Sequence, residues 1–201
     1  KRNNGDMFSV TGYFKKLKSP IEQTQESSGG TVIRSFRNAE DGIATGVEIE
    51  FRKELFKNLR IGANGSYMYT NVILPEGGVY TDSERALQGA SLFLINADIS
   101  YTPQLRGESD LTLALVYNVQ GPRIETVGIY GTGNIKQQTL HTMDFIASYA
   151  INKHLNLRLQ MKDLLNSTIR FKQELPATGQ KVEVESFRPG TNAEIGVSYR
   201  F

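Results

Sequence analysis

The last nine residues constrain the fold of this chain more than any other stretch. Apolar residues alternate there with polar or small ones, and the apolar set is Ala193, Ile195, Val197, Tyr199 and Phe201. A period of two puts the apolar side chains on one face of a β-strand and the polar ones on the other. A soluble protein rarely leaves so apolar a terminal strand uncovered, whereas a transmembrane β-barrel needs such a strand to face lipid.

The same alternation recurs in seven earlier segments of the chain. They are Phe8–Lys15, Val47–Arg52, Ile61–Tyr69, Phe93–Tyr101, Leu111–Asn118, Met143–Ile151 and Leu155–Lys162. Strands of about nine residues cross a bilayer when they are tilted. We therefore expect an all-β fold, the portion of an antiparallel transmembrane β-barrel that holds about eight up-and-down strands.

Short and long connections between these runs alternate strictly. The short ones are Leu55–Asn58, Pro103–Ser109 and Asn152–His154, and the long ones are Ser19–Asp41, Leu74–Ser91, Gly121–Leu140 and Asn166–Pro189. Outer-membrane barrels have short periplasmic turns and long outer loops. The short links fall at the end that holds the C-terminus, so we expect that end to be periplasmic. Val32–Arg37 is interpreted as an extension of the second strand above the membrane.

Composition excludes several classes of function. The chain has 201 residues, no cysteine, a formal net charge of +2 and a mean hydropathy of -0.35. A balanced, scattered charge gives no indication of nucleic-acid binding. Without cysteine there is no disulfide framework or thiolate site, and His141 and His154 lie at opposite ends of one expected strand, too far apart to share a metal. No nucleophile with an oriented base is found, so we expect neither an enzyme nor a cofactor.

Alternation alone is also compatible with a soluble, lipocalin-like barrel whose apolar face points inward. The content of the polar face favours the membrane alternative. A face exposed to solvent is usually rich in Lys and Glu, whereas much of the polar face here is small and neutral. Its members include Gly62, Asn64, Ser66, Asn96, Ser100, Thr112, Ala114, Ser148 and Gly196.

Six phrases in this order resemble the C-terminal barrel of a TonB-dependent outer-membrane receptor. They are Ser9–Gln23, Gly42–Leu55, Glu84–Thr102, Leu140–Ile151, Leu159–Asn166 and Ile195–Phe201. The Arg-x-Leu-Gln-Gly phrase at Arg85–Gly89 resembles the version common in Bacteroidota. The resemblance covers essentially the whole chain, and it implies a location in the bacterial outer membrane.

The resemblance implies that residues 1–201 form the last third of a barrel of about 22 strands, with the plug domain and the N-terminal barrel strands absent. Such receptors actively import a scarce solute, here a siderophore, cobalamin, glycan or peptide, with energy delivered through TonB. The implied partners are outer-membrane lipid, the barrel-assembly machinery, the plug domain, the TonB system through the missing N-terminal part, and a surface lipoprotein. Two alternatives stay open: a small passive eight-stranded barrel serving as anchor or adhesin, and a soluble binder of a small ligand.

Two groups of residues are candidate sites. Val197, Tyr199 and Phe201 resemble the signal that the barrel-assembly machinery reads, and they also suit a lipid-facing strand. Aromatic and arginine residues on the outer loops are typical of ligand capture and equally of loop self-packing. This second group is Tyr80, Arg85, Arg123, Glu125 and Tyr130. The glycine pair in Gly131-Thr132-Gly133 is interpreted as a flexible loop tip.

Overall fold

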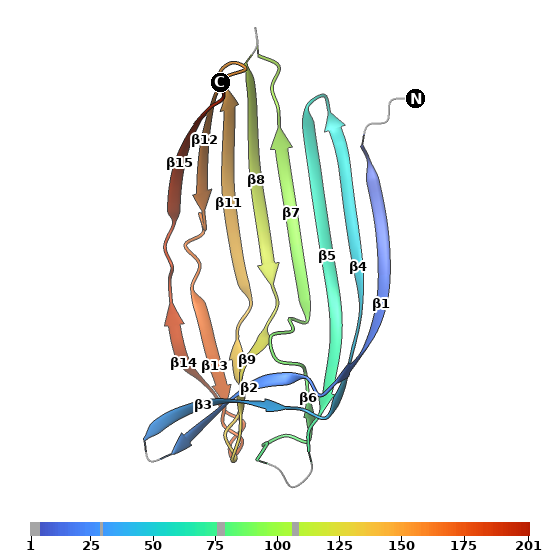
Figure 1. Ribbon diagram of the computed structural model, residues 1–201, viewed down its shortest axis with the longest axis vertical. Helices are drawn as coiled ribbons and strands as arrows, with labels where there is room; N and C mark the ends of the chain where they lie inside the picture. Colours follow the sequence, from blue (N-terminus) through green and yellow to red (C-terminus); the bar gives the residue numbers. More distant parts are fainter. Residues whose placement is uncertain (1–4, 29, 76–78, 106–108) are drawn as a thin grey trace.

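The computed structural model describes residues 5–28, 30–75, 79–105 and 109–201 (Figure 1). Every regular element in these ranges is a β-strand, arranged in two sheets. A search of the described residues for a helix that could cross a membrane finds none.

Eight long strands form the larger sheet, and each pairs antiparallel with the next in chain order. They are β1 (Met7–Lys18), β4 (Asp41–Phe56), β5 (Leu59–Ile73), β7 (Phe93–Tyr101), β8 (Asp110–Gln120), β11 (Leu140–Ala150), β12 (Leu155–Lys162) and β15 (Asn192–Tyr199). The two-residue β6 (Glu84–Arg85) adds to β5. The expected up-and-down antiparallel architecture is confirmed.

The strand ends differ from those expected. Most strands extend beyond the alternating core, and β4 reaches 16 residues. The last strand is bounded at Tyr199, and the Arg200 N–H carries its backbone pairing one residue further by donating to the His154 carbonyl at 2.8 Å. The short connections lie at the end of the sheet that holds the C-terminus, which we call the turn end (Figure 1). The long connections lie at the opposite end, which we call the loop end.

A second sheet fills the loop end, where only connections were expected. Its order is β14-β13-β10-β9-β2-β3, with β2 (Ile21–Ser28), β3 (Thr31–Asn38), β9 (Arg123–Gly128), β10 (Ile135–Gln137), β13 (Ile169–Glu174) and β14 (Lys181–Phe187). The β2–β3 hairpin lies crosswise to the long strands (Figure 1). The expectation that Val32–Arg37 extends the second long strand is therefore wrong, because this segment belongs to β3 and turns away from β4.

Strand register places the apolar residues of the larger sheet opposite one another. Ile61 pairs with Ile99, and Ile99 pairs in turn with Leu115. Leu157 pairs with Val197 at the other side of the sheet. The apolar residues consequently form one continuous face across all eight strands. Ile99 is 43% exposed and Val197 67%, so this face covers no internal core.

The buried apolar residues gather at the loop end instead. Ala39, Val72 and Leu74 form one cluster, against which Tyr80 and Leu87 pack. Buried residues of β9 and the turn after it add a second group, namely Ile124, Val127 and Ile129. The second sheet and the segment Val79–Ser91 thus fold as a packed unit, which we call the cap. Hydrophobic burial stabilises the cap in the way it stabilises a soluble domain.

Candidate functional site at the loop end

All five residues proposed from the sequence as ligand contacts lie in the cap. Tyr80 forms an isolated bridge with Ile129, and the Tyr130 N–H donates to the Val79 carbonyl at 2.7 Å. These contacts place Tyr80 and Tyr130 on adjoining segments. The other three residues lie on β6 and β9, so segments far apart in the sequence meet at one end of the sheet.

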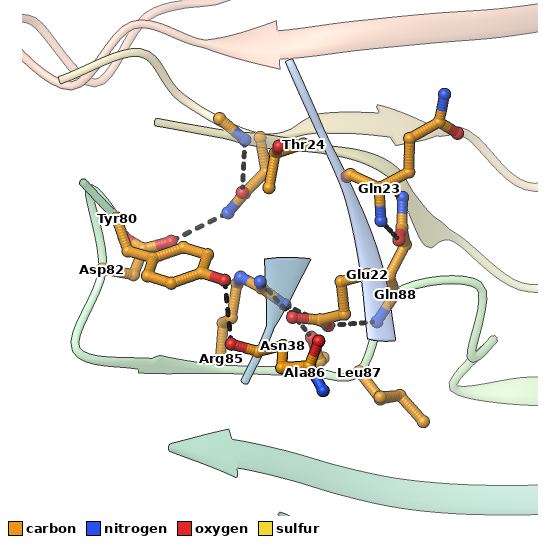
Figure 2. Close-up of polar contacts among 12 residues, drawn as sticks. Glu22, Gln23, Thr24, Asn38, Tyr80, Asp82, Arg85, Ala86, Leu87 and Gln88 are labelled. Carbon is orange, nitrogen blue, oxygen red and sulfur yellow. Dashed lines mark hydrogen bonds and ion pairs between the residues drawn. The ribbon is translucent and has the colours of Figure 1, made fainter. Parts of the chain in front are cut away.

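Arg85 is buried in a two-point ion pair with Glu22 of β2. Its Nη1 lies 2.7 Å from Oε1 and its Nη2 lies 2.6 Å from Oε2. The two side chains are 5% and 0% exposed. Figure 2 shows the guanidinium of Arg85 pointing at the carboxylate of Glu22. Paired N–H···O bonds between planar groups give this contact a defined geometry as well as charge attraction.

Gln88 connects the hairpin to the rest of the cap through both its backbone and its side chain. Its N–H donates to Glu22 Oε1 at 3.2 Å. Its Oε1 accepts from the Gln23 N–H at 2.6 Å, and its Nε2 donates to the carbonyls of Gln23 and Glu125 at 3.2 and 2.6 Å. The Gln88 side chain therefore bridges β2 and β9, whose backbone pairing spans few residues.

Tyr80 packs beside the ion pair. Its ring centroid lies 6.0 Å from the guanidinium carbon of Arg85, and its hydroxyl donates to the Asn38 carbonyl at 3.2 Å. Burial raises the pKa of Tyr80 above its usual 10.0, and the charge of Glu22 adds to this rise, while Arg85 and Arg37 oppose it. The phenol thus stays protonated, and its hydrogen bond to Asn38 holds the last residue of β3 against the Val79–Ser91 segment.

Arg123 and Glu125 form a second, more exposed pair on β9. The side chains are 32% and 44% exposed, with 3.5 Å between Arg123 Nη2 and Glu125 Oε2. Arg123 also donates from Nε to Gln137 Oε1 at 2.9 Å. Tyr130 is 63% exposed at the tip of the β9–β10 turn. Of the five residues, Glu125 and Tyr130 are the most exposed to solvent, whereas Arg85 is buried against Glu22.

The turn at Gly131-Thr132-Gly133 is hydrogen-bonded, so its interpretation as a flexible tip is not supported. Thr132 Oγ1 accepts from the Ile129 N–H at 3.1 Å, and the Thr132 carbonyl accepts from Thr81 Oγ1 at 2.7 Å. The Gly133 carbonyl accepts from Gln173 Nε2 at 2.9 Å. These bonds tie the turn to the Val79–Ser91 segment and to β13.

The proposed assembly residues lie at the opposite end, on the edge strand β15 and just after it. Val197, Tyr199 and Phe201 are 67%, 60% and 106% exposed. Tyr199 stacks on His154 with ring centroids 5.9 Å apart and meets Phe201 edge-on at 5.2 Å. This geometry leaves their role in assembly a prediction, and it places the three side chains where another protein or lipid can reach them.

Sequence reasoning missed Glu22 and Gln88. Gln88 lies inside the Arg85–Gly89 phrase, which was noticed for its resemblance and not for a contact. Glu22 is the second residue of a strand rich in polar residues, and no alternation with an apolar face marks that strand. Arg85 could be singled out as the one arginine of its long loop, but Glu22 is one of several acidic residues in the preceding long loop, so the sequence carries no signal for the pair.

An open sheet with one continuous apolar face, one polar face and long loops at one end defines a wall of a membrane β-barrel. The model of the family described as Outer membrane protein beta-barrel family matches residues 1–199, and the chain belongs to this family. It is therefore a β-barrel protein of the bacterial outer membrane. Searches of curated proteins and of solved structures found no match.

Proposed function

We propose that this chain forms part of the wall of a larger, TonB-dependent barrel that imports a scarce solute. The observation that carries the proposal is the open sheet. β1 and β15 lie at the two ends of the strand order, and within the described residues no pairing joins them. A strand edge with unpaired N–H and C=O groups is not tolerated in hydrocarbon, so each edge calls for a neighbouring strand.

The two faces of the sheet support the same proposal. Amide and small side chains occupy much of the polar face, beside charged residues such as Glu50, and Asn96 Nδ2 donates there to Asn64 Oδ1 at 2.7 Å. An eight-stranded barrel is just wide enough for side chains to fill it, whereas a wider one leaves a polar interior. In our proposal the loop end faces the outside and its cap lies over that interior. That TonB delivers the energy for import is inferred from the resemblance of the chain to TonB-dependent receptors.

A small passive eight-stranded barrel is the competing function, and disulfide trapping distinguishes the two. We would introduce cysteine pairs between polar-face positions of β1 and β15, for example Thr11→Cys with Glu194→Cys, and scan the register by two residues each way. Gln160→Cys with Glu194→Cys is the positive control, because these residues face each other on β12 and β15. The chain has no native cysteine to interfere.

We expect a disulfide in the control pair alone. Disulfides between β1 and β15 at any register would show that the eight strands close on themselves, which would contradict the proposal. Uptake is tested separately in cells that carry the complete protein. Import that stops on dissipation of the proton-motive force supports TonB dependence, and import that continues unchanged argues against it.

A further inference from the structure

The β2–β3 hairpin is attached to the rest of the cap at few points. Among the residues that the structure describes, eight pairs join β2 to β3 and two pairs, Thr24 with Val127 and Gln25 with Gly128, join the hairpin to β9. The hairpin is therefore held to the rest of the cap by these two pairs, by the hydrogen bond from the Tyr80 hydroxyl to the Asn38 carbonyl, and by the contacts of Glu22 and Gln88. A small number of side chains decides whether it stays in place.

The donors that hold Glu22 belong to the other side of this contact. Arg85 is fixed by β6, where it pairs with Val72 of β5, and by its contact with the Tyr80 ring. Two guanidinium nitrogens and the Gln88 N–H converge on one carboxylate. This donor set, Arg85 with the Gln88 backbone, would persist if the hairpin moved away.

The donor set also has unused capacity. Arg85 Nε is buried and has no hydrogen-bond partner among the described residues. A guanidinium that stays buried after losing its anion is strongly unfavourable, so as long as Arg85 remains covered an anion must lie beside it. Planar guanidinium groups recognise carboxylates through two parallel bonds, which is the contact seen here.

We propose that Arg85 and the Gln88 N–H form a carboxylate-binding site in which Glu22 stands in for a ligand. A solute that carries a carboxylate exchanges with Glu22, and the hairpin is then released from the loop end. This inference rests on the proposed transport function, because it identifies the ligand of the cap with the transported solute and names carboxylate-bearing solutes as its class. The binding site itself is testable without transport.

The experiment uses the complete protein in outer-membrane vesicles, with spin labels on Phe36→Cys of β3 and Phe187→Cys of β14, both exposed positions. Propionate is the probe, propionamide its neutral match, and inorganic phosphate a second anion. Glu22→Ala empties the site, so we expect the label distances to broaden toward an open hairpin. Millimolar propionate should refill the site and restore the closed distance, whereas propionamide should not.

The same probe should act in the opposite direction on the unmodified chain, where propionate competes with Glu22 and shifts the distances toward the open form. Arg85→Gln in the Glu22→Ala background should abolish the response. If phosphate and propionate gave equal responses, the site would bind anions without preference for carboxylates, and the proposal would be overturned. Equal responses to propionate and propionamide would also overturn it.

Should Glu22→Ala fail to fold, judged by its migration in unheated gel samples, Glu22→Gln keeps the side-chain shape and removes the charge. Propionate should then open the hairpin at a lower concentration than in the unmodified chain. An unchanged midpoint would contradict the proposal. These measurements are independent of energised uptake and of the β1–β15 disulfides, so the binding site and the transport function can fail separately.

Discussion

Arg85 and Glu22 are 63 residues apart in the sequence and meet through two hydrogen bonds of 2.6 and 2.7 Å in the interior of the cap. The contact joins the segment after β5 to the hairpin after β1. It turns two connections, which the sequence indicates only as long loops, into one packed structure. The stability of the cap should depend on this contact far more than on ion pairs at the surface.

Arg85→Gln should destabilise docking of the β2–β3 hairpin by about 3–5 kcal/mol, because it leaves the Glu22 carboxylate buried without a counter-charge. Hydrogen exchange of the β2 and β3 amides measures the effect. Arg52→Gln is the matched control, since Arg52 pairs with Glu50 at 2.7 Å but is 59% exposed. Its cost should be about 0–1 kcal/mol in the strands it touches. Equal costs would contradict the assigned role of the buried pair.

Tyr80 should make hairpin docking sensitive to alkaline pH. The pKa of Tyr80 is raised while the hairpin is docked. Above about pH 10 the Tyr80 phenol therefore ionises when the hairpin is released but keeps its proton when the hairpin is docked. The docked state binds more protons, and docking therefore weakens as pH rises. Tyr80→Phe should remove this part of the pH dependence at a cost of about 0.5–1.5 kcal/mol for the lost hydrogen bond.

The spin-label distances described above, recorded between about pH 8 and 11, measure the effect of Tyr80. Tyr130→Phe is the control, because the Tyr130 ring is 63% exposed. A Tyr80→Phe curve that runs parallel to the unmodified one would show that another group causes the pH dependence.

Gly46→Ala should destabilise the larger sheet by about 1–3 kcal/mol, since a Cβ there would lie 2.5 Å from the Tyr67 carbonyl oxygen and 2.7 Å from the Tyr13 hydroxyl oxygen. Gly65→Ala on the neighbouring strand is the control, because the nearest atom to its Cβ would be 3.6 Å away. Unfolding by urea from lipid vesicles gives both values. A Gly65 variant as unstable as the Gly46 variant would refute the steric explanation.

The long strands could be predicted from the sequence because each one repeats the same physical requirement. A strand between lipid and a polar interior must alternate, and Ile61, Ile99 and Val197 satisfy this in the positions that the register places opposite apolar partners. The short turns were also predictable. Asn152 Oδ1, for example, accepts from the N–H groups of His154 and Leu155 within the turn itself.

The cap could not be predicted in the same way. Its strands are stabilised by contacts between different connections, such as Thr24 of β2 with Val127 of β9, and no local period records such a contact. The five candidate residues lie at the loop end, and their role in ligand capture stays a prediction. The pairing of Arg85 depends on Glu22, which the sequence does not distinguish from other loop carboxylates. The membrane strands are predictable because lipid imposes the same alternating pattern on each of them. The cap is not, because its structure depends on individual contacts between residues far apart in the sequence.

Removal of the aromatic C-terminus should reduce the amount of protein in the outer membrane. Tyr199 and Phe201 are 60% and 106% exposed, in edge contact with each other, and available to a partner. We expect Phe201→Ser to lower the fraction that migrates as folded barrel in unheated gel samples. Phe56→Ser, at a residue 73% exposed in another turn-end position, is the control. Equal losses for both variants would indicate a general effect of exposed aromatics.

The central claim is that the apolar face of the larger sheet contacts hydrocarbon and the polar face a hydrated interior. Single cysteines at successive positions of β7, from Ile95 to Ser100, test it through quenching of an attached fluorophore by lipid-borne nitroxide in outer-membrane vesicles. The account predicts strong quenching at Ile95, Ala97 and Ile99 and weak quenching at Asn96, Asp98 and Ser100. Uniform quenching, or the opposite phase, would contradict it.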